Sequence, residues 1–236
     1  MKDKIGIIFE DKDILVLDKP AGITVNKSDT TKDEYTLQDF VEEKFNKDGI
    51  KLNTENIDFN QRAGIVHRID KETSGILIVA KNVESFENLQ AQFKERKVKK
   101  TYIALAHGLV APDDGEIRVP VGRLPWNRKR FGVLAGGKDA ITKYRVIEKK
   151  KGFTLLELSP ETGRTHQIRV HLKYINHPIF ADYLYAGRKT SRDDRKVLER
   201  VFLHAHKISF YHPKTNELIS LESPLPLELT NVLNSI

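Results

Sequence analysis

The sequence predicts an α+β protein with a mixed, largely antiparallel central sheet and flanking helices. Short apolar runs typical of strands outnumber segments with helical spacing, and many follow one another directly along the chain. Consecutive strands of this kind pair as antiparallel neighbours, whereas a doubly wound parallel sheet needs a helix between strands. We expect a single domain over residues 1–236, built as one body or as two closely joined halves with the active-site cleft between them.

The predicted strands are bounded by charged residues or by Gly and Pro. The first two are separated by four charged residues, a pattern that predicts a hairpin. Gly and Pro punctuate residues 111–137, which favours turns there. In chain order, strands are expected over residues 5–9, 14–17, 65–69, 76–80, 102–110, 144–147, 153–158, 207–210 and 218–221.

Three segments show the spacing of amphipathic helices. Thr36, with Asp39 three residues later, has the pattern of a helix N-cap before an apolar stripe, and Asn82 precedes a second stripe. A third helix is expected from Thr165, with apolar residues on one face and basic residues on the other. The polar residues 46–63 are expected to form a loop.

The composition excludes several classes of protein. The 236 residues include no cysteine, which excludes a disulfide framework, a thiol nucleophile, an iron–sulfur cluster and a zinc knuckle. The longest apolar runs hold about five residues, far fewer than the roughly 18 that a membrane helix needs. The first twenty residues contain no signal-peptide core. We therefore expect a cytoplasmic protein that does not enter a membrane.

The chain is basic, and its charge is unevenly distributed. Lys and Arg total 40 against 33 Asp and Glu, a net charge of +7. Residues 1–60 carry −5 and residues 61–236 carry +12, with basic clusters at 94–100, 123–130 and 188–200. Such clusters indicate a polyanionic partner, most simply nucleic acid. A solvated surface rich in Lys and Arg explains the charge equally well.

Asp70 stands at the end of the predicted strand 65–69, two residues after Arg68. A carboxylate presented at a strand end is well placed to act as a nucleophile or a base. The alternative, which this segment alone favours, is that Asp70 only hydrogen-bonds the backbone of its turn.

Tyr102 shares one face of its predicted strand with Ala104, Ala106 and Gly108. A tyrosine beside such small residues leaves room for a flat partner, such as a nucleobase stacked on its ring. The alternative is a helix packed over the small residues, with Tyr102 in the core, and the segment by itself favours this alternative.

The segment from Thr162 to Leu172 places basic residues at the expected start of the third helix. Backbone N–H groups at a helix start, with Arg164 and His166 beside them, can hold a phosphate group. Arg169 lies one turn further on and can pair with a carboxylate such as Asp70, which would favour the ionised carboxylate. The alternative is an exposed amphipathic helix with a basic face.

Eight histidines raise the question of a metal site. His204 and His206 would share a strand face, whereas His166 and His171 diverge on the predicted helix. They are accompanied by no HExxH motif and no carboxylate cluster. We expect no metal site, and the sequence also lacks a glycine-rich phosphate loop.

Taken together, these segments resemble the RluA-type pseudouridine synthases over most of the chain, from Ile7 to about Leu221. Seven motifs in family order carry the resemblance. They are IIFEDKDILVLDKPAGITV, RAGIVHRIDKETSGILIVAKN, VKKTYIALAHG, GGKDAITKYRV, LSPETGRTHQIRVHL, HPIFADYLY and FLHAHKISFYHP.

The resemblance implies a pseudouridine-synthase fold and an enzyme that isomerises uridine within RNA without a cofactor or metal. The family's catalytic aspartate falls on Asp70, its active-site tyrosine on Tyr102, and the arginine that pairs with the aspartate on Arg169. Arg68 falls on the arginine that helps to expel the target base. We expect Arg169→Ala to lower activity strongly without unfolding the protein.

The resemblance also implies that RNA is the partner. The AGIVHRIDKETSG segment is most similar to members that modify large-subunit ribosomal RNA (rRNA), although other members act on transfer RNA (tRNA). Lys138, Arg164 and His166, together with the basic clusters at 123–130 and 188–200, are expected to contact the RNA. We expect a monomer with no obligatory protein partner.

The sequence departs from the family pattern at three positions. Asn26 stands where many members have His, and Ala181 and Ala186 stand where Gly is usual. These positions lie outside the catalytic set, so they bear on substrate fit more than on chemistry. Two other functions stay open: a catalytically silent RNA-binding module on the same fold, and a metal-dependent phosphodiesterase that uses the histidines. The retained catalytic residues favour the isomerase over the silent module.

Overall fold

The computed structural model describes residues 5–127 and 130–236. No helix in these ranges is long and apolar enough to span a membrane. The chain divides into two compact units, and each has its own strands and helices. Unit 1 consists of Met1–Lys99 and Lys207–Ser223, and unit 2 consists of Lys100–His206 and Pro224–Ile236.

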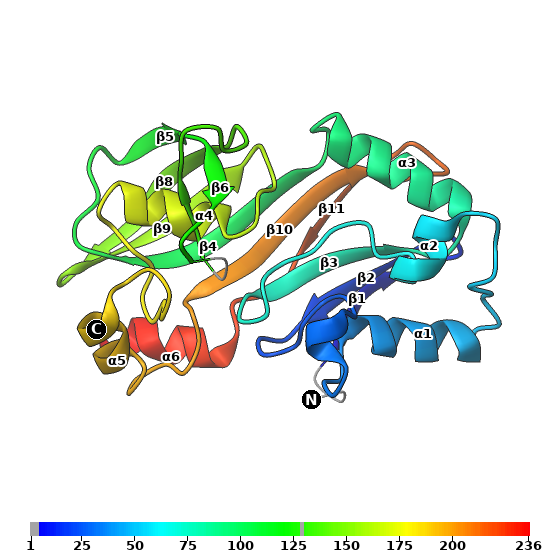
Figure 1. Cartoon of the computed structure of the whole chain (residues 1–236), viewed down its shortest axis with the longest axis horizontal. Helices are drawn as coiled ribbons and strands as arrows, with labels where there is room; N and C mark the ends of the chain where they lie inside the picture. The colour runs from blue at the N-terminus through cyan, green and yellow to red at the C-terminus, as the bar shows by residue number, and fades with distance from the viewer. Residues whose placement is uncertain (1–4, 128–129) are drawn as a thin grey trace. The chain divides into compact units, whose positions relative to one another are not determined.

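Unit 1 contains antiparallel strands with helices around them (Figure 1). β1 pairs with β2, β2 pairs with β3, and β11 pairs with the Lys207–Tyr211 part of β10. β3 is buried along its whole length, which explains why it is a continuous apolar run. The elements are β1 (Gly6–Glu10), β2 (Ile14–Lys19), η2 (Asp29–Thr31), α1 (Leu37–Lys47), α2 (Ile57–Arg62), β3 (Ser74–Ala80), α3 (Val83–Lys94), β10 (Leu203–Tyr211, shared with unit 2) and β11 (Leu218–Glu222).

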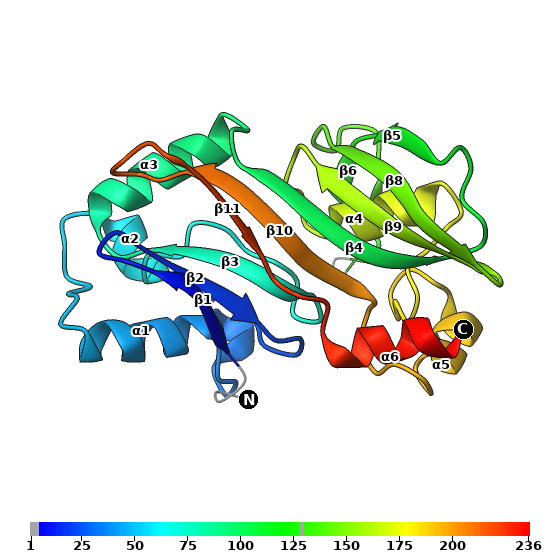
Figure 2. The same cartoon turned by 180° about the vertical axis from the view of Figure 1, so that it is seen from behind.

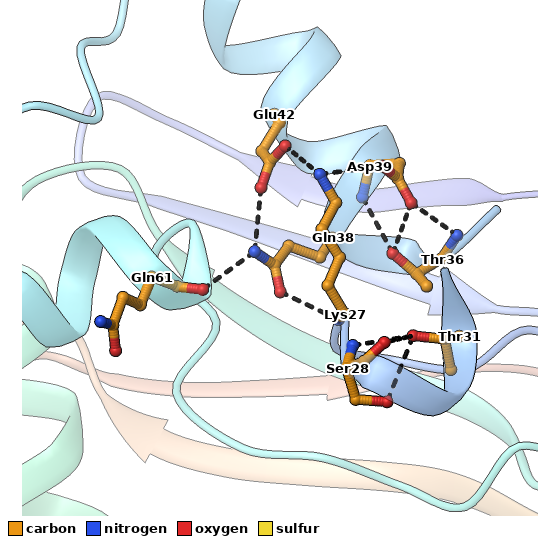
Figure 3. A network of polar contacts seen from close by, with 8 residues as sticks. All are labelled: Lys27, Ser28, Thr31, Thr36, Gln38, Asp39, Glu42 and Gln61. Carbon is orange, nitrogen blue, oxygen red and sulfur yellow. Dashed lines mark hydrogen bonds and ion pairs between the residues drawn. The ribbon is translucent and has the colours of Figure 1, made fainter. Parts of the chain in front are cut away.

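A polar network fixes the start of α1, as Figure 3 shows. The Asp39 N–H donates to the Thr36 hydroxyl, and the Asp39 carboxylate accepts the Thr36 N–H at 2.8 Å, which is the predicted capping box. The buried Gln38 side chain accepts the Lys27 N–H at 3.2 Å and donates to the Gln61 carbonyl at 2.9 Å. The network therefore ties α1 to the end of α2, from which the chain continues toward the predicted catalytic turn.

The segment expected to form a loop at 46–63 contains the short helix α2. The Asn56 side chain caps this helix by accepting the Phe59 N–H at 2.9 Å. Phe59 is buried and meets the ring of Phe86 on α3 edge-on, with ring centroids 5.6 Å apart. One cap and one buried ring hold a helix that is too short for its spacing to be visible in the sequence.

The strand predicted at 65–69 is not formed. Ile65 makes an isolated bridge to Val79 of β3, and the chain then leaves the ladder. The Ile78 N–H donates to Nε2 of His67 at 2.9 Å instead of to the carbonyl of a neighbouring strand. The residues of this segment are apolar because they are buried, and not because they pair as a strand.

In unit 2, the strands β4, β9, β8 and β5 are hydrogen-bonded in this order as antiparallel neighbours. α4 lies over one face of this sheet in Figure 1 and is seen behind it in Figure 2. The strands β6 and β7 form a separate hairpin inside the segment punctuated by Gly and Pro. The elements are β4 (Lys99–His107), β5 (Asp114–Arg118), β6 (Val121–Arg123), β7 (Phe131–Val133), β8 (Ile141–Lys150), β9 (Phe153–Pro160), α4 (Gln167–Tyr174), α5 (Arg188–Asp194) and α6 (Leu227–Ser235).

α4 contributes to two separate cores in unit 2. Leu172 packs in the main core with Leu105 of β4, Leu156 of β9 and Leu229 of α6. A smaller core joins the β6–β7 hairpin to the opposite side of α4, and its buried members are Val121, Ala140, Val170 and Tyr185. A helix buried on two sides has little room for an exposed basic face, and this constraint sets the environment of Arg169.

Candidate active site

Asp70 lies half-buried in unit 1, at the start of the turn that leads into β3. Its carbonyl accepts the Thr73 N–H at 3.0 Å, and the next carbonyl, that of Lys71, accepts the Gly22 N–H at 2.8 Å. Arg68, two residues earlier, is exposed. The backbone that carries Asp70 is therefore held by hydrogen bonds, which is the preorganisation a reactive group needs.

Lys19, the last residue of β2, is fully buried and directs its ammonium group at backbone carbonyls. It donates to the carbonyls of Pro20 and Ile23, each at 2.9 Å, and of Lys71 at 3.2 Å. Burying a charge is costly unless hydrogen bonds satisfy it, and these three acceptors match the three ammonium protons. Lys19 therefore joins the Pro-Ala-Gly turn to the turn that carries Asp70.

Gly64 brings the chain into this region through a close backbone approach. Its φ is +73°, and a Cβ at this position would lie 2.0 Å from the carbonyl oxygen of Ala80. The Ala80 N–H in turn donates to the Gly64 carbonyl at 2.9 Å. Only glycine fits both the left-handed backbone and the contact, so the segment that leads to Asp70 starts from a fixed point on β3.

Arg169, on α4, is only 4% exposed, so the predicted alternative of an exposed basic face is wrong for this residue. Its guanidinium forms a two-point ion pair with the fully buried carboxylate of Asp182, with Nε–Oδ2 at 2.7 Å and Nη2–Oδ1 at 2.9 Å. The N–H groups of Leu184 and Tyr185 also donate to Oδ1 of Asp182, at 3.0 and 3.2 Å. This planar, charge-assisted arrangement fixes the orientation of Arg169.

His166 is the N-cap of α4 and adopts a left-handed backbone, with φ 57° and ψ 17°. Its Nδ1 atom lies 2.8 Å from the hydroxyl of Tyr185, and the two rings meet edge-on with centroids 5.7 Å apart. The guanidinium carbon of Arg169 lies 5.1 Å from the centre of the same tyrosine ring. His166 and Arg169, one helical turn apart, therefore share Tyr185 as a neighbour.

The remaining predicted residues of unit 2 lie on β4 and near the start of α4. Tyr102 is half-buried opposite Leu158 of β9 and packs against the main core. Arg164 donates from Nε to the carbonyl of Asp139 at 3.0 Å, beside the exposed Lys138. Two of the predicted RNA contacts are therefore close neighbours on the surface.

The β6–β7 hairpin carries the basic cluster predicted at 123–130, of which Arg128 and Lys129 lie outside the described residues. The guanidinium carbon of Arg123 lies 4.8 Å from the centre of the Phe131 ring. Trp126, in the loop of the hairpin, is 75% exposed. An exposed indole among arginines is a platform on which a nucleobase can stack, and the charge pattern of the sequence did not reveal it.

Lys100 is half-buried on β4, two residues before Tyr102. Its Nζ lies 3.8 Å from the position that a Cβ on Gly163 would take. Among residues 5–127 and 130–236 the Lys100 ammonium group has no hydrogen-bond or ion-pair partner, and burial alone lowers its pKa to about 8.

Within the part of the chain that the structure describes, one group of side chains has the spacing of metal ligands: Asp11, Asp13 and His212. The Nδ1 atom of His212 accepts the N–H groups of Lys214 and Thr215, at 3.2 and 3.0 Å. Its proton therefore lies on Nε2, which donates to Asp11 at 2.8 Å. These bonds explain the cluster as the anchor of the β10–β11 connection.

The fold and these features are those of an enzyme acting on nucleic acid: an antiparallel α+β scaffold, a carboxylate on a fixed turn, and a basic hairpin. A model of the RNA pseudouridylate synthase family matches residues 13–174. The chain belongs to this family, which confirms the resemblance seen in the sequence motifs.

Similar proteins support the assignment along nearly the whole chain. An RNA pseudouridine synthase of Bacillus subtilis, YlyB, is 38% identical over 98% of this chain and 73% of its own length. The ribosomal large subunit pseudouridine synthase D of Neisseria meningitidis serogroup B is also 38% identical, over 98% of this chain. The chain spans 60% of the length of that relative.

Solved structures show the same fold. The human RNA pseudouridylate synthase domain containing 4 superposes with a TM-score of 0.73 at 24% identity, covering 97% of this chain and 92% of that one. The human RNA pseudouridylate synthase domain containing 1 gives a TM-score of 0.72 at 24% identity, covering 100% of this chain and 95% of that one. The predicted pseudouridine-synthase-like fold is therefore confirmed.

Proposed function

We propose that this protein converts specific uridines of large-subunit ribosomal RNA into pseudouridine, with Asp70 as the catalytic group. The observation that carries the proposal is the family match over residues 13–174, which includes Asp70, Tyr102 and Arg169 in one span. A relative that is named as a large-subunit ribosomal enzyme supports the choice of RNA.

The reaction rearranges one nucleotide and needs no other reactant. The bond from the sugar to ring nitrogen 1 breaks, the base rotates, and the sugar bonds to carbon 5. Carbon 5 loses its hydrogen to water as a proton, and nitrogen 1 gains a proton. Asp70 acts either as a nucleophile, on the base or on the sugar, or as the base that removes a sugar proton.

The target uridine must leave its base stack before it can react, at a cost of about a few kcal/mol. Arg68 is long, planar and exposed, two residues from Asp70, so it suits the role of filling the vacated space. The Tyr102 ring offers the flipped base a stacking surface. Arg169, which the family motif assigns to the catalytic set, is proposed to supply a fixed positive charge to the reaction.

The RNA backbone is assigned to the basic surface of unit 2. Arg164 bonds to the carbonyl of Asp139, which follows the exposed Lys138 in the chain, and the β6–β7 hairpin adds Arg123 and the exposed Trp126. Each phosphate that these cations neutralise strengthens binding and steepens its dependence on salt. No protein partner and no cofactor enters this proposal, and the protein is proposed to act as a monomer in the cytoplasm.

The test uses RNA from a strain that lacks the gene, labelled with tritium at carbon 5 of uridine and separated into large-subunit ribosomal, small-subunit ribosomal and transfer RNA. Conversion to pseudouridine releases that tritium into water. We expect release from the large-subunit fraction, with or without a chelator. Release only from transfer RNA would refute the proposed target, and salt-sensitive binding without release from any fraction would identify a silent RNA-binding module.

A further inference from the structure

We infer that Tyr185 is a positioning residue that docks the β6–β7 hairpin onto α4 and thereby couples RNA binding on the hairpin to the orientation of Arg169. The inference rests on the proposed function, and it assigns a role to a residue outside the predicted catalytic and RNA-binding sets. Tyr185 is 7% exposed, and it follows Asp182 by three residues in the loop after α4.

Tyr185 supports Arg169 in two ways. Its backbone N–H donates to Oδ1 of Asp182 at 3.2 Å, the same oxygen that accepts Nη2 of Arg169 at 2.9 Å. The face of its ring lies 5.1 Å from the guanidinium carbon, a distance at which the negative face of an aromatic ring attracts a cation. Any displacement of Tyr185 therefore acts on two contacts that help to orient Arg169: the ion pair with Asp182 and the contact with the tyrosine ring.

The hydroxyl of Tyr185 contacts the hairpin and the helix start together. It accepts the N–H of Phe131, the first residue of β7, at 3.1 Å. It also shares a hydrogen bond with Nδ1 of His166 at 2.8 Å. The Phe131 and His166 rings meet edge-on, with centroids 5.4 Å apart, so hairpin and helix close around one oxygen atom.

The backbone of His166 is consistent with this docking. A left-handed conformation at a non-glycine residue costs about 1 to 3 kcal/mol and persists only where surrounding contacts enforce it. Here the His166 side chain contacts both Tyr185 and Phe131, and these contacts help to hold it. The strained residue immediately precedes α4, which carries Arg169 in its first turn.

The coupling predicts how RNA bound on the hairpin affects the orientation of Arg169. Arg123 and Trp126 belong to the hairpin, and the β7 strand of this hairpin donates a hydrogen bond from Phe131 to the Tyr185 hydroxyl. RNA that holds the hairpin in the docked position stabilises the Tyr185 contacts, and these contacts stabilise the orientation of Arg169. Loss of the hydroxyl alone should therefore weaken RNA binding, while loss of the whole ring should weaken binding and also slow the chemical step.

The first test compares Tyr185→Phe with the matched control Tyr183→Phe. Tyr183 is 52% exposed beside Arg195, and its hydroxyl has no partner among the described residues. Trp126 is the only tryptophan in the chain, so its fluorescence anisotropy reports the mobility of the hairpin without a label. We expect Tyr185→Phe to lower the anisotropy and to speed hydrogen exchange at the Phe131 amide, and the control to change neither.

The second test measures tritium release from the labelled large-subunit RNA at varied RNA concentration. A neutral hydrogen bond corresponds to a change of about 3- to 10-fold in an equilibrium constant, so Tyr185→Phe should raise KM by about that factor with little change in kcat. Tyr185→Leu, which also removes the ring beside Arg169, should lower kcat as well. Circular dichroism would establish that both variants are folded.

Tyr185→Phe with unchanged anisotropy, exchange and KM would overturn the inference, as would a fall in kcat at constant KM. The fluorescence and exchange measurements need no turnover. If the wild type releases no tritium while these two measurements respond to Tyr185→Phe, then the proposed function fails and the docking of the hairpin stands.

Discussion

The ammonium group of Lys19 donates a hydrogen bond to the carbonyl of Lys71, 52 residues further along the chain and next to Asp70. The Gly22 N–H donates to the same carbonyl. Lys19 and Gly22 thus hold the same carbonyl of the turn that carries Asp70, although they are remote from it in sequence. This turn owes part of its rigidity to Lys19, the last residue of β2.

Replacing Lys19 by Met should destabilise the protein and impair catalysis. The substitution keeps the length of the side chain but removes the ammonium hydrogen bonds to the carbonyls of Pro20, Ile23 and Lys71, of which the Lys71 carbonyl keeps the Gly22 N–H as a donor. We expect a loss of about 2–4 kcal/mol in the free energy of unfolding. Urea denaturation measures this loss, and tritium release by the folded fraction should fall at least tenfold. Lys12→Met, at an exposed position, is the control; equal stability of the two variants would contradict the role given to Lys19.

Arg169→Ala is now expected to destabilise the fold as well as to abolish activity. Its removal leaves the buried Asp182 carboxylate without its cation, and breaking a buried pair costs about 3–5 kcal/mol. The sequence alone led to the expectation that this variant stays folded, because it does not show that Arg169 is buried beside Asp182. Arg169→Lys keeps the charge and separates the effect on stability from the effect on activity. Calorimetry should show a smaller loss of stability than for Arg169→Ala, while tritium release should remain low because a lysine cannot form the two-point ion pair. Normal turnover by Arg169→Lys would remove Arg169 from the proposed site.

Lys100 gives the protein a distinct dependence on pH. Burial lowers the pKa of its ammonium group from 10.5 to about 8 in the folded protein. Between these two values the unfolded chain binds more protons than the folded one, so this group makes the free energy of unfolding rise with pH across that window. Below pH 8 the buried charge is a cost, which Lys100→Met removes.

Urea denaturation at pH 7 and at pH 9.5 tests this prediction. Lys100→Met should be more stable than the wild type at pH 7, and its advantage should shrink at pH 9.5, where Lys100 is neutral in the folded state. The neighbouring Lys99 is exposed, so Lys99→Met should show no such change. An advantage that is equal at both pH values would show that Lys100 titrates normally.

The hairpin cation Arg123 should contribute one phosphate contact. We expect Arg123→Gln to reduce the slope of log affinity against log salt by about 0.7 to 0.9, since that is the contribution of one neutralised phosphate. Arg62→Gln, in unit 1, should leave the slope unchanged. Filter binding of the large-subunit fraction between 50 and 200 mM salt would measure the slope. An unaltered slope for Arg123→Gln would exclude Arg123 of the hairpin from the RNA-binding surface.

Local signals predicted much of the fold correctly. Thr36 and Asn82 cap their helices as expected, since a capping side chain acts within three residues of its own position. The first hairpin also formed as predicted. The prediction of a strand at 65–69 was wrong because burial and strand pairing both produce apolar runs. Only the contact of His67 with Ile78 in the folded protein distinguishes the two causes.

Site residues could be predicted where they stand in a family motif. Contacts between side chains that are distant in sequence could not be predicted. Asp70, Tyr102 and Arg169 stand in motifs, and their roles remain predictions. Asp182, which forms an ion pair with Arg169, lies 13 residues further on, in no helical or strand register with it. Tyr185 was not predicted for the same reason, because residues from separate segments contact it.

The most direct measurement compares Asp70→Asn with Asp33→Asn, an exposed aspartate of the same unit, on tritium-labelled large-subunit RNA. Both changes remove one carboxylate charge, so a general electrostatic effect on RNA binding would appear in both. The account predicts tritium release by the wild type and by Asp33→Asn, and none by Asp70→Asn, which should still bind the RNA. Release by Asp70→Asn at the wild-type rate would contradict it.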